Sequence, residues 1–383
     1  MDQRDVVIVG GGVAGAAAAC AFARVGIPVV LFERRDLVRD PNRGDNLHPP
    51  TRALLERWGA LDLLRKRGAF DVRFFVLTDV PRRRQARFEL SPCPLLVLNH
   101  AEIETALLEF ATEHGAAVRS EAVRAARRAA DRWVVETDHG PAATARLVVG
   151  ADGAGSLVRQ TAGIPVARKD YGMAAVVLHA ARPAWADPDS FYGILHPEGG
   201  ILVAPTTPAG RCRVVVIVRA NEAASWMAAD EAELQRRLRQ RDPRCGELMV
   251  ERRGGSHLYH MIRQHAARYT GEGLALIGDA AHVTNPFGGQ GMNLAIQDAA
   301  ALAEHAAAVL RDSEGTNAAL AGALAAYERQ RRPINARALE GANAGAWLTA
   351  PGRARYALAT ALLAGLSVAP RLRTRLQTRF GGA

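Results

Sequence analysis

The sequence predicts an α/β protein in which a three-layer Rossmann-like domain is interrupted by an inserted, mainly antiparallel β-sheet domain and followed by C-terminal helices. Three observations support this fold class. A strand, a glycine-rich turn, a helix and a second strand follow one another over residues 6–32. Residues 171–265 place β-branched runs between proline and glycine turns, which is typical of an antiparallel sheet. Long alanine-rich helices follow a buried strand at 274–277.

The same signals assign the elements in chain order. The opening βαβ unit has a β-branched strand, a turn, an alanine-rich helix that Gly26 closes, and a second strand, at residues 6–9, 10–12, 13–24 and 28–32. Leucines at helical spacing predict a helix over about 49–67, which begins at Pro49. Strands follow at 73–77, 95–98, 118–123, 133–136 and 147–150, with a helix at 101–114. The inserted region has strands at 174–178, 200–204 and 213–218 and a helix at 230–241.

Composition excludes several classes of protein. The chain has 383 residues, of which 49% are hydrophobic, enough to build the cores of two or three domains. The formal net charge is +10, but the arginines are spread along the chain and the run at 82–84 has no interleaved aromatic residues, so we expect no nucleic-acid partner. The four cysteines are widely spaced and form no Cys-x-x-Cys pair, which favours a reducing cytoplasm and predicts no metal site.

The glycine turn carries the first functional signal. Gly10, Gly12 and Gly15 stand between a strand and a helix, and Glu33 closes the second strand. The first glycine permits the tight turn, the second lets backbone N–H groups approach a pyrophosphate, and the third lets the helix pack on the strand. Glu33 is placed to accept the hydrogen bonds of a ribose. The pattern predicts a dinucleotide site, with a merely structural turn as the alternative, and it does not separate NAD from FAD.

Three further segments narrow the choice. Residues 150–159 include Asp152. Residues 274–282 contain a buried strand with Asp279 at its end, and residues 285–293 form a glycine-rich turn before a helix. With the glycine turn, these segments resemble the fingerprints of the group A flavoprotein monooxygenases, the para-hydroxybenzoate hydroxylase type. The resemblance implies that FAD is the cofactor.

The resemblance also assigns residues to the parts of FAD. It implies that Val13 and Ala14 lie at the pyrophosphate, that the backbone of Val123 lies beside the adenine, and that Asp279 binds the ribityl and pyrophosphate region. Pro286 is implied to lie on the flavin face where oxygen adds. The backbone after it is implied to meet the pyrimidine edge, where a helix N-terminus stabilises the negative charge of the reduced flavin. The residues named there are Gly289, Gly291, Met292 and Asn293.

Four polar residues complete the implied site. Arg43 matches the family segment that crosses the flavin, with an exposed loop arginine as the alternative. Where the family has an arginine in Arg-x-x-Leu-x-x-x-Leu, this chain has His100, which can still hydrogen-bond the phosphate or ribityl chain with less charge at neutral pH. Asp152 and Arg159 match a motif that touches both FAD and nicotinamide in the family, and turn and cap roles are the alternative.

The resemblance implies a division of the chain and a reaction. The FAD-binding domain comprises 1–70, 98–170 and 268–335, the substrate-binding domain 71–97 and 171–267, and a C-terminal helical segment 336–383. NAD(P)H transiently reduces FAD, O2 adds at C4a, and the hydroperoxide hydroxylates an aromatic or other electron-rich, lipophilic small molecule. Tyr192, His196 and Tyr259 are pocket candidates, with core or surface positions as the alternative. A reductase of the geranylgeranyl reductase type and a catalytically silent FAD-binding protein are the other two readings.

The C-terminal segment raises a separate question. Residues 356–370 carry no charge and are flanked by arginines. Fifteen residues are too few to span a bilayer, which needs about twenty. We expect a helix packed on the FAD domain or on a partner subunit, with peripheral membrane contact as the alternative. The pattern defines no oligomeric state.

Overall fold

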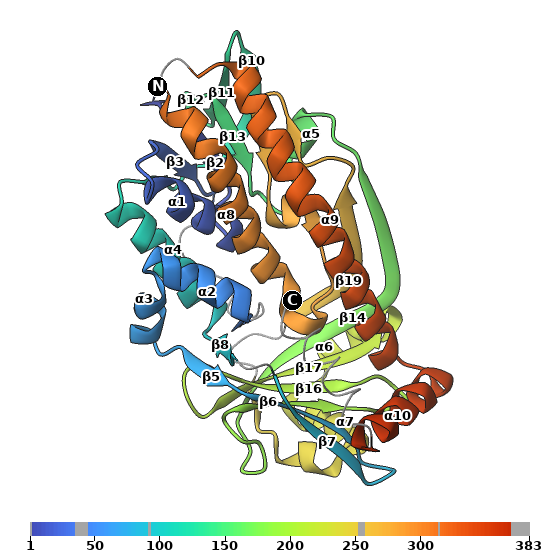
Figure 1. Cartoon of the computed structure of the whole chain (residues 1–383). Helices are drawn as coiled ribbons and strands as arrows, with labels where there is room; N and C mark the ends of the chain where they lie inside the picture. The colour runs from blue at the N-terminus through green and yellow to red at the C-terminus, as the bar shows by residue number, and fades with distance from the viewer. Residues whose placement is uncertain (1, 35–44, 91–92, 252–256, 313–314, 369–383) are drawn as a thin grey trace.

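The computed structural model describes residues 2–34, 45–90, 93–251, 257–312 and 315–368. Figure 1 shows a domain of helices and smaller sheets at the top, a large sheet below it, and one long helix beside both.

A six-stranded sheet forms the centre of the first domain. Five of its strands pair in parallel, and a short antiparallel strand lies at one edge. The central strands are buried along their whole length, because elements cover both faces of the sheet. In sheet order the strands are β20 (Thr270–Gly271), β21 (Leu274–Leu276), β13 (Leu147–Gly150), β2 (Val6–Val9), β3 (Val29–Phe32) and β9 (Ala117–Arg119).

Helices cover one face of this sheet and a smaller sheet covers the other. Helix α1 (Val13–Ala23) packs against both α4 (His100–Glu113) and α8 (Gln290–Arg311). The third layer is a four-stranded sheet of β1 (Asp2–Gln3), β12 (Gly140–Ala145), β11 (Arg132–Thr137) and β10 (Val123–Ala129). The three-layer Rossmann-like fold is therefore confirmed.

The single helix expected over 49–67 is wrong. The chain forms α2 (Pro49–Trp58) and α3 (Leu61–Lys66), separated by Gly59. Gly59 adopts a φ of 79°, which ends α2, whereas the leucine spacing continues across the break. A small sheet of β4 (Asn46–Leu47), β8 (Leu95–Val97) and β5 (Phe70–Val72) lies beside these helices.

The inserted region forms a large sheet, and the mainly antiparallel prediction is confirmed. Only the pairing of β15 with β6 is parallel among the described strands of this sheet. Its strands are β6 (Phe74–Asp79), β7 (Arg84–Glu89), β14 (Val166–Ala181), β15 (Ser190–Ile194), β16 (Ile201–Thr206), β17 (Arg211–Arg219), β18 (Val250–Glu251), β19 (His257–Ala266) and β22 (His282–Val283).

The two faces of this sheet have different partners. Side chains alternate along β17, so Val214 and Val216 point into a core with α6 (Ala223–Ala228) and α7 (Glu231–Arg241). Val215 and Ile217 lie on the opposite face, in a cluster with Met173. That second face also receives the C-terminal end of α9 (Asn317–Thr349).

Helix α9 contacts both domains (Figure 1). Near its middle, Tyr327 donates a hydrogen bond from its hydroxyl to Leu276 O at 2.8 Å, and the Glu328 carboxylate accepts from Thr270 N at 3.1 Å. At its end, Ala346 and Ala350 are buried against the inserted sheet. The predicted domain limits stay a prediction, and α9 runs without a break past residue 335, where one of them was set.

Helix α10 (Arg353–Val368) packs on the inserted sheet. The expected packing on the FAD domain is therefore wrong, whereas packing on a partner subunit stays a prediction. Ala359 and Leu363 are buried against β7, and the Tyr356 hydroxyl donates to Asp79 Oδ1 at 2.7 Å. Leu358 and Leu362 on the outer side are 44% and 41% exposed. None of the helices in the described ranges has the length and apolar character needed to cross a membrane. Peripheral membrane contact stays the alternative.

Candidate functional site

Three turns meet at one edge of the six-stranded sheet. Because β2, β13 and β21 run in parallel, the turns that follow them lie together. Gly10 has a φ of 103°, and a Cβ on it would overlap the backbone of Ala151. A Cβ on Gly278 would lie 2.8 Å from the Cβ of Ala14. The sequence segments that carry Gly10, Asp152 and Asp279 are thus in direct contact.

Two helix N-termini open at this edge without a side-chain cap. Helix α1 begins after Gly12 and α8 begins after Gly289, and neither has an acidic residue in its first turn. The first N–H groups of a helix have no partner inside the helix, and they carry the positive end of its dipole. Val13 and Gly15 are buried, and Ala14 is half-buried, so the glycine turn offers mainly backbone to an anion.

Glu33 and Asp279 supply two carboxylates beside these helices. Glu33 is 8% exposed, and its Oε2 accepts a hydrogen bond from Gly11 N at 2.5 Å. Asp279 is half-buried in the 3-10 turn η4 (Gly278–Ala280), and its carboxylate has no hydrogen-bond partner within the described part of the chain. The buried hydroxyl of Thr284 likewise has no partner there. These groups fit a ligand with hydroxyl and N–H donors.

A buried network that the sequence did not reveal holds the Asp279 turn. Asp298 on α8 is fully buried and accepts hydrogen bonds from Gly278 N at 3.2 Å, Arg331 Nε at 2.8 Å and Asn335 Nδ2 at 2.9 Å. His282 Nε2 lies 2.6 Å from its Oδ2. Burial alone raises the pKa of Asp298, but His282, Arg331 and the hydrogen bonds outweigh it and lower that pKa to about 2.

Asn293 lies at the turn before α8, but its side chain forms hydrogen bonds to other residues of the chain. Its Nδ2 donates to Gly289 O at 2.8 Å and to Asn46 O at 3.0 Å, and its Oδ1 accepts from His48 N at 2.7 Å. Gly288 and Gly289 have φ values of 77° and 62°, which the turn requires. The side chain of Asn293 therefore fixes the turn, and the backbone remains available to a ligand. His48 was missed as a site residue.

His100 lies at the start of α4, and the structure brings it to the glycine turn through Glu104. His100 Nε2 is 3.3 Å from Glu104 Oε1, and both residues are buried. A Cβ on Gly12 would lie 3.5 Å from that same Glu104 oxygen. Asp45 accepts from His100 N at 3.3 Å and pairs with Arg213 Nη2 of β17 at 3.0 Å. Asp45 and Arg213 thereby join the two domains, a link between positions too distant in sequence to be predicted.

The remaining predicted residues are placed as follows. The Asp152 carboxylate accepts from Ser156 Oγ at 2.5 Å and from Val158 N at 3.2 Å, which is the turn and cap role held open as an alternative. Arg159 donates to backbone carbonyls of Ala280 and Ala154. Val123 begins β10 and is half-buried. Pro286 is exposed, Gly291 and Met292 are half-buried in the first turn of α8, and Arg43 lies outside the described residues.

The three pocket candidates of the inserted domain do not lie together in one site. Tyr192 is buried on the face covered by α6 and α7, and its hydroxyl donates to Asp187 Oδ2 at 3.1 Å. Tyr259 lies on the opposite face, in the cluster with Met173. Burial and the charge of Arg241 lower the pKa of His196, whose Nδ1 accepts from Glu198 N at 3.2 Å. Of the two tyrosines, only Tyr259 is on the face that the end of α9 covers.

Comparison with known proteins agrees with this geometry. The family model of the FAD binding domain matches residues 3–342. The chain is 31% identical over 354 residues to ubiquinone hydroxylase UbiL of Rhodospirillum rubrum, and the matched region covers 86% of this chain and 78% of that protein. It is 29% identical over 335 residues to dialkyldecalin synthase of Streptomyces rugosporus, covering 87% and 70%.

A solved structure has the same fold. PqsL of P. aeruginosa, in complex with 2-aminobenzoylacetate, superposes with a TM-score of 0.81 at 28% identity, over 93% of this chain and 99% of that one. The glycine turn, the open carboxylate of Asp279 and the uncapped α8 N-terminus fit FAD as cofactor. The chain therefore belongs to the FAD binding domain family, and it is an FAD-dependent monooxygenase of the group A, para-hydroxybenzoate hydroxylase type.

Proposed function

We propose that this enzyme uses NAD(P)H and O2 to hydroxylate an aromatic or other electron-rich small molecule. The observation that carries the proposal is the edge at which the three turns and two uncapped helices meet, with the ion pair of Asp45 and Arg213 joining this region to β17 of the inserted sheet. Two relatives support the substrate class, since one is named a ubiquinone hydroxylase and the other is bound to 2-aminobenzoylacetate.

The residues of the edge have distinct roles in this proposal. The N–H groups that begin α1 hold the pyrophosphate of FAD, Glu33 accepts from the ribose, and Asp279 accepts from the ribityl region. The backbone over 289–293 faces the pyrimidine edge, and the α8 N-terminus stabilises negative charge there. When bound, FAD supplies the redox chemistry that links NAD(P)H to oxygen.

The inserted sheet supplies a dry wall for this chemistry. Met173, Val215 and Ile217 present apolar side chains on the face of the sheet that receives the end of α9. Such a wall excludes water from a reactive intermediate and orients a planar substrate by shape. We assign no acid or base to this face.

The test is turnover of the purified, FAD-loaded chain with a panel of phenols, quinolones and polycyclic aromatics. We expect substrate to accelerate NAD(P)H oxidation and isotopically labelled O2 to place one oxygen atom in the product. Ring formation without oxygen uptake would instead match the activity in the name of dialkyldecalin synthase. Anaerobic saturation of an alkene would favour a reductase. Either result overturns the proposal.

A further inference from the structure

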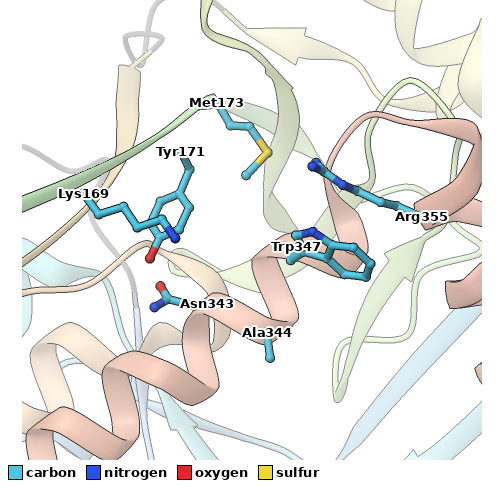
Figure 2. A pocket seen from close by; sticks show the side chains of 7 residues that line it. All are labelled: Lys169, Tyr171, Met173, Asn343, Ala344, Trp347 and Arg355. Atoms are coloured by element: carbon cyan, nitrogen blue, oxygen red, sulfur yellow. The ribbon is translucent and has the colours of Figure 1, made fainter.

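A pocket of about 300 Å³ opens between β14, α9 and the start of α10. Figure 2 shows its lining side chains around an open space, with Lys169, Tyr171 and Asn343 on one side and Trp347 and Arg355 on the other. Met173 from β14 forms the apolar part of the lining between them. None of the roles assigned above uses Lys169, Trp347 or Arg355.

The lining combines flat aromatic surface with positive charge. Lys169 Nζ lies 5.4 Å from the ring centre of Tyr171, and the Arg355 guanidinium lies 5.3 Å from that of Trp347. Neither cation forms an ion pair within the part of the chain that the structure describes, and no carboxylate lines the pocket. Asp170, the acidic residue nearest in sequence, accepts a hydrogen bond from Gly172 N instead. The cations therefore lack a counter-charge that an anionic ligand would supply.

A polar group inside the pocket also lacks a partner. The Tyr171 hydroxyl oxygen is buried and makes no hydrogen bond within the described residues. A buried hydroxyl without a partner is unfavourable, which makes it a site where a ligand acceptor would be stabilised. Burial also raises the pKa of this phenol, so that it stays a hydrogen-bond donor.

The pocket adjoins the turn where the flavin ring is expected. Asn343 lines the pocket, and its Oδ1 accepts a hydrogen bond from Asn285 Nδ2 at 3.3 Å. Asn285 directly precedes Pro286. On the other side, Met173 belongs to the apolar cluster of the inserted sheet with Ile217. A molecule in the pocket would lie one side chain away from the Pro286 turn.

We propose that this pocket docks the substrate, and that the substrate is a planar aromatic anion of one or two rings, such as an aromatic carboxylate. The ring stacks between the aromatic side chains, and Lys169 and Arg355 pair with its negative charge. The volume is at the lower end of the range for small-molecule sites, which favours a small ring system over a dinucleotide. This assignment rests on the proposed function.

The experiment measures binding by calorimetry to the FAD-loaded full chain, with no turnover required. The probe is 1-hydroxy-2-naphthoate, and 1-naphthol, which has the same rings without the carboxylate, is the neutral comparison. We expect the naphthoate to bind more tightly, and high salt to weaken only the naphthoate. Lys169→Met and Arg355→Met should each weaken it about 3- to 5-fold, and the double variant about tenfold or more, with naphthol unaffected.

Matched variants separate charge from folding. Lys66→Met changes the other lysine and Arg353→Gln an exposed arginine at the start of α10, and both should bind the naphthoate normally. Lys169→Arg and Arg355→Lys keep the charge and should retain most of the binding. Trp347→Ala should weaken both probes, because stacking does not depend on the carboxylate.

Three results would overturn the assignment. Equal affinity for the two probes, or naphthoate binding that Lys169→Met and Arg355→Met leave intact, would remove the charge argument. Displacement of the naphthoate by NADP⁺ would give the pocket to the nicotinamide nucleotide. Because the measurement is binding, these failures are distinct from a failure of labelled O2 to enter a product.

Discussion

Replacing Asp298 by Asn should destabilise the whole chain, although Asp298 touches no predicted ligand. The substitution keeps the size of the side chain but removes the charge that faces Arg331 and His282 in a fully buried site. The amide also turns one acceptor into a donor: in place of Oδ1 it opposes the N–H groups of Arg331 and Asn335, and in place of Oδ2 it opposes that of Gly278.

The structure sets the magnitude. The pKa of Asp298 falls from 3.8 to about 2, which corresponds to about 2 to 3 kcal/mol in favour of the ionised form. Leaving a buried cation without its partner costs about 3 to 5 kcal/mol. We therefore expect the free energy of unfolding to fall by about 2 to 5 kcal/mol at neutral pH. Since the folded pKa is depressed, the wild type should lose this contribution as pH falls from about 4 through 2.

The assay is urea unfolding of the flavin-free and FAD-loaded proteins, because the flavin-free measurement removes the stabilisation that comes from ligand binding. Asp138→Asn is the matched control, since Asp138 also accepts two hydrogen bonds from one arginine, Arg124, but both side chains are more than half exposed. Asp138→Asn should be indistinguishable from wild type. If Asp298→Asn unfolded at the same urea concentration as the wild type, the Asp298 network would not contribute to stability and our account of the Asp279 turn would be wrong.

Three further predictions follow from the site and the C-terminal helix. Asp279→Ala should weaken FAD binding about 10- to 150-fold, because it removes a charge-assisted contact. Flavin titration measures the loss, and Asp62→Ala, at an exposed position of α3, is the control. Full flavin retention would contradict the placement of the site. Burial lowers the pKa of His48 from 6.5 to about 4, so this residue should contribute up to about 3 kcal/mol of stability above pH 6.5 that is lost as pH falls through 4. His48→Gln should flatten the stability profile in that window, and an unchanged slope counts against the assignment. Neither the wild type nor the double variant Leu358→Gln/Leu362→Gln should float with liposomes, because α10 already buries Ala359 and Leu363 against the protein. Flotation of the wild type but not of the variant would establish a membrane anchor.

The sequence was sufficient for the parts of the fold that depend on local pattern. The β2–α1–β3 unit is confirmed because β-branched strands and a glycine turn are local signals. The break at Gly59 was missed because the leucine spacing spans it, and only the positive φ reveals the end of α2. The cap role of Asp152 was open to sequence analysis, because its partners Ser156 and Val158 are near it in the sequence.

The contacts that position the site could not be read in the same way. The pairs Asp298 with Arg331 and Asp45 with Arg213 join residues on different elements, and no spacing rule connects them. Asn293 was assigned to the flavin on resemblance, yet its side chain is consumed by Gly289, Asn46 and His48. Tertiary packing decides such partners, whereas the motif fixes only which residue types are present.

Helix α9 has a consequence for recombination between related enzymes. Its 33 residues extend about 50 Å. Tyr327 in its N-terminal half contacts the parallel sheet, and Ala346 near its end and Ala350 just after it are buried against the inserted sheet. A chimera that exchanges only the segments 71–97 and 171–267 would pack the inserted sheet of one enzyme against the α9 end of the other. The side chains at that contact would then not match in volume. The transferable unit is therefore the inserted sheet together with residues 343–350, and crossovers belong within α9 before Asn343 and in the short connection before Arg353.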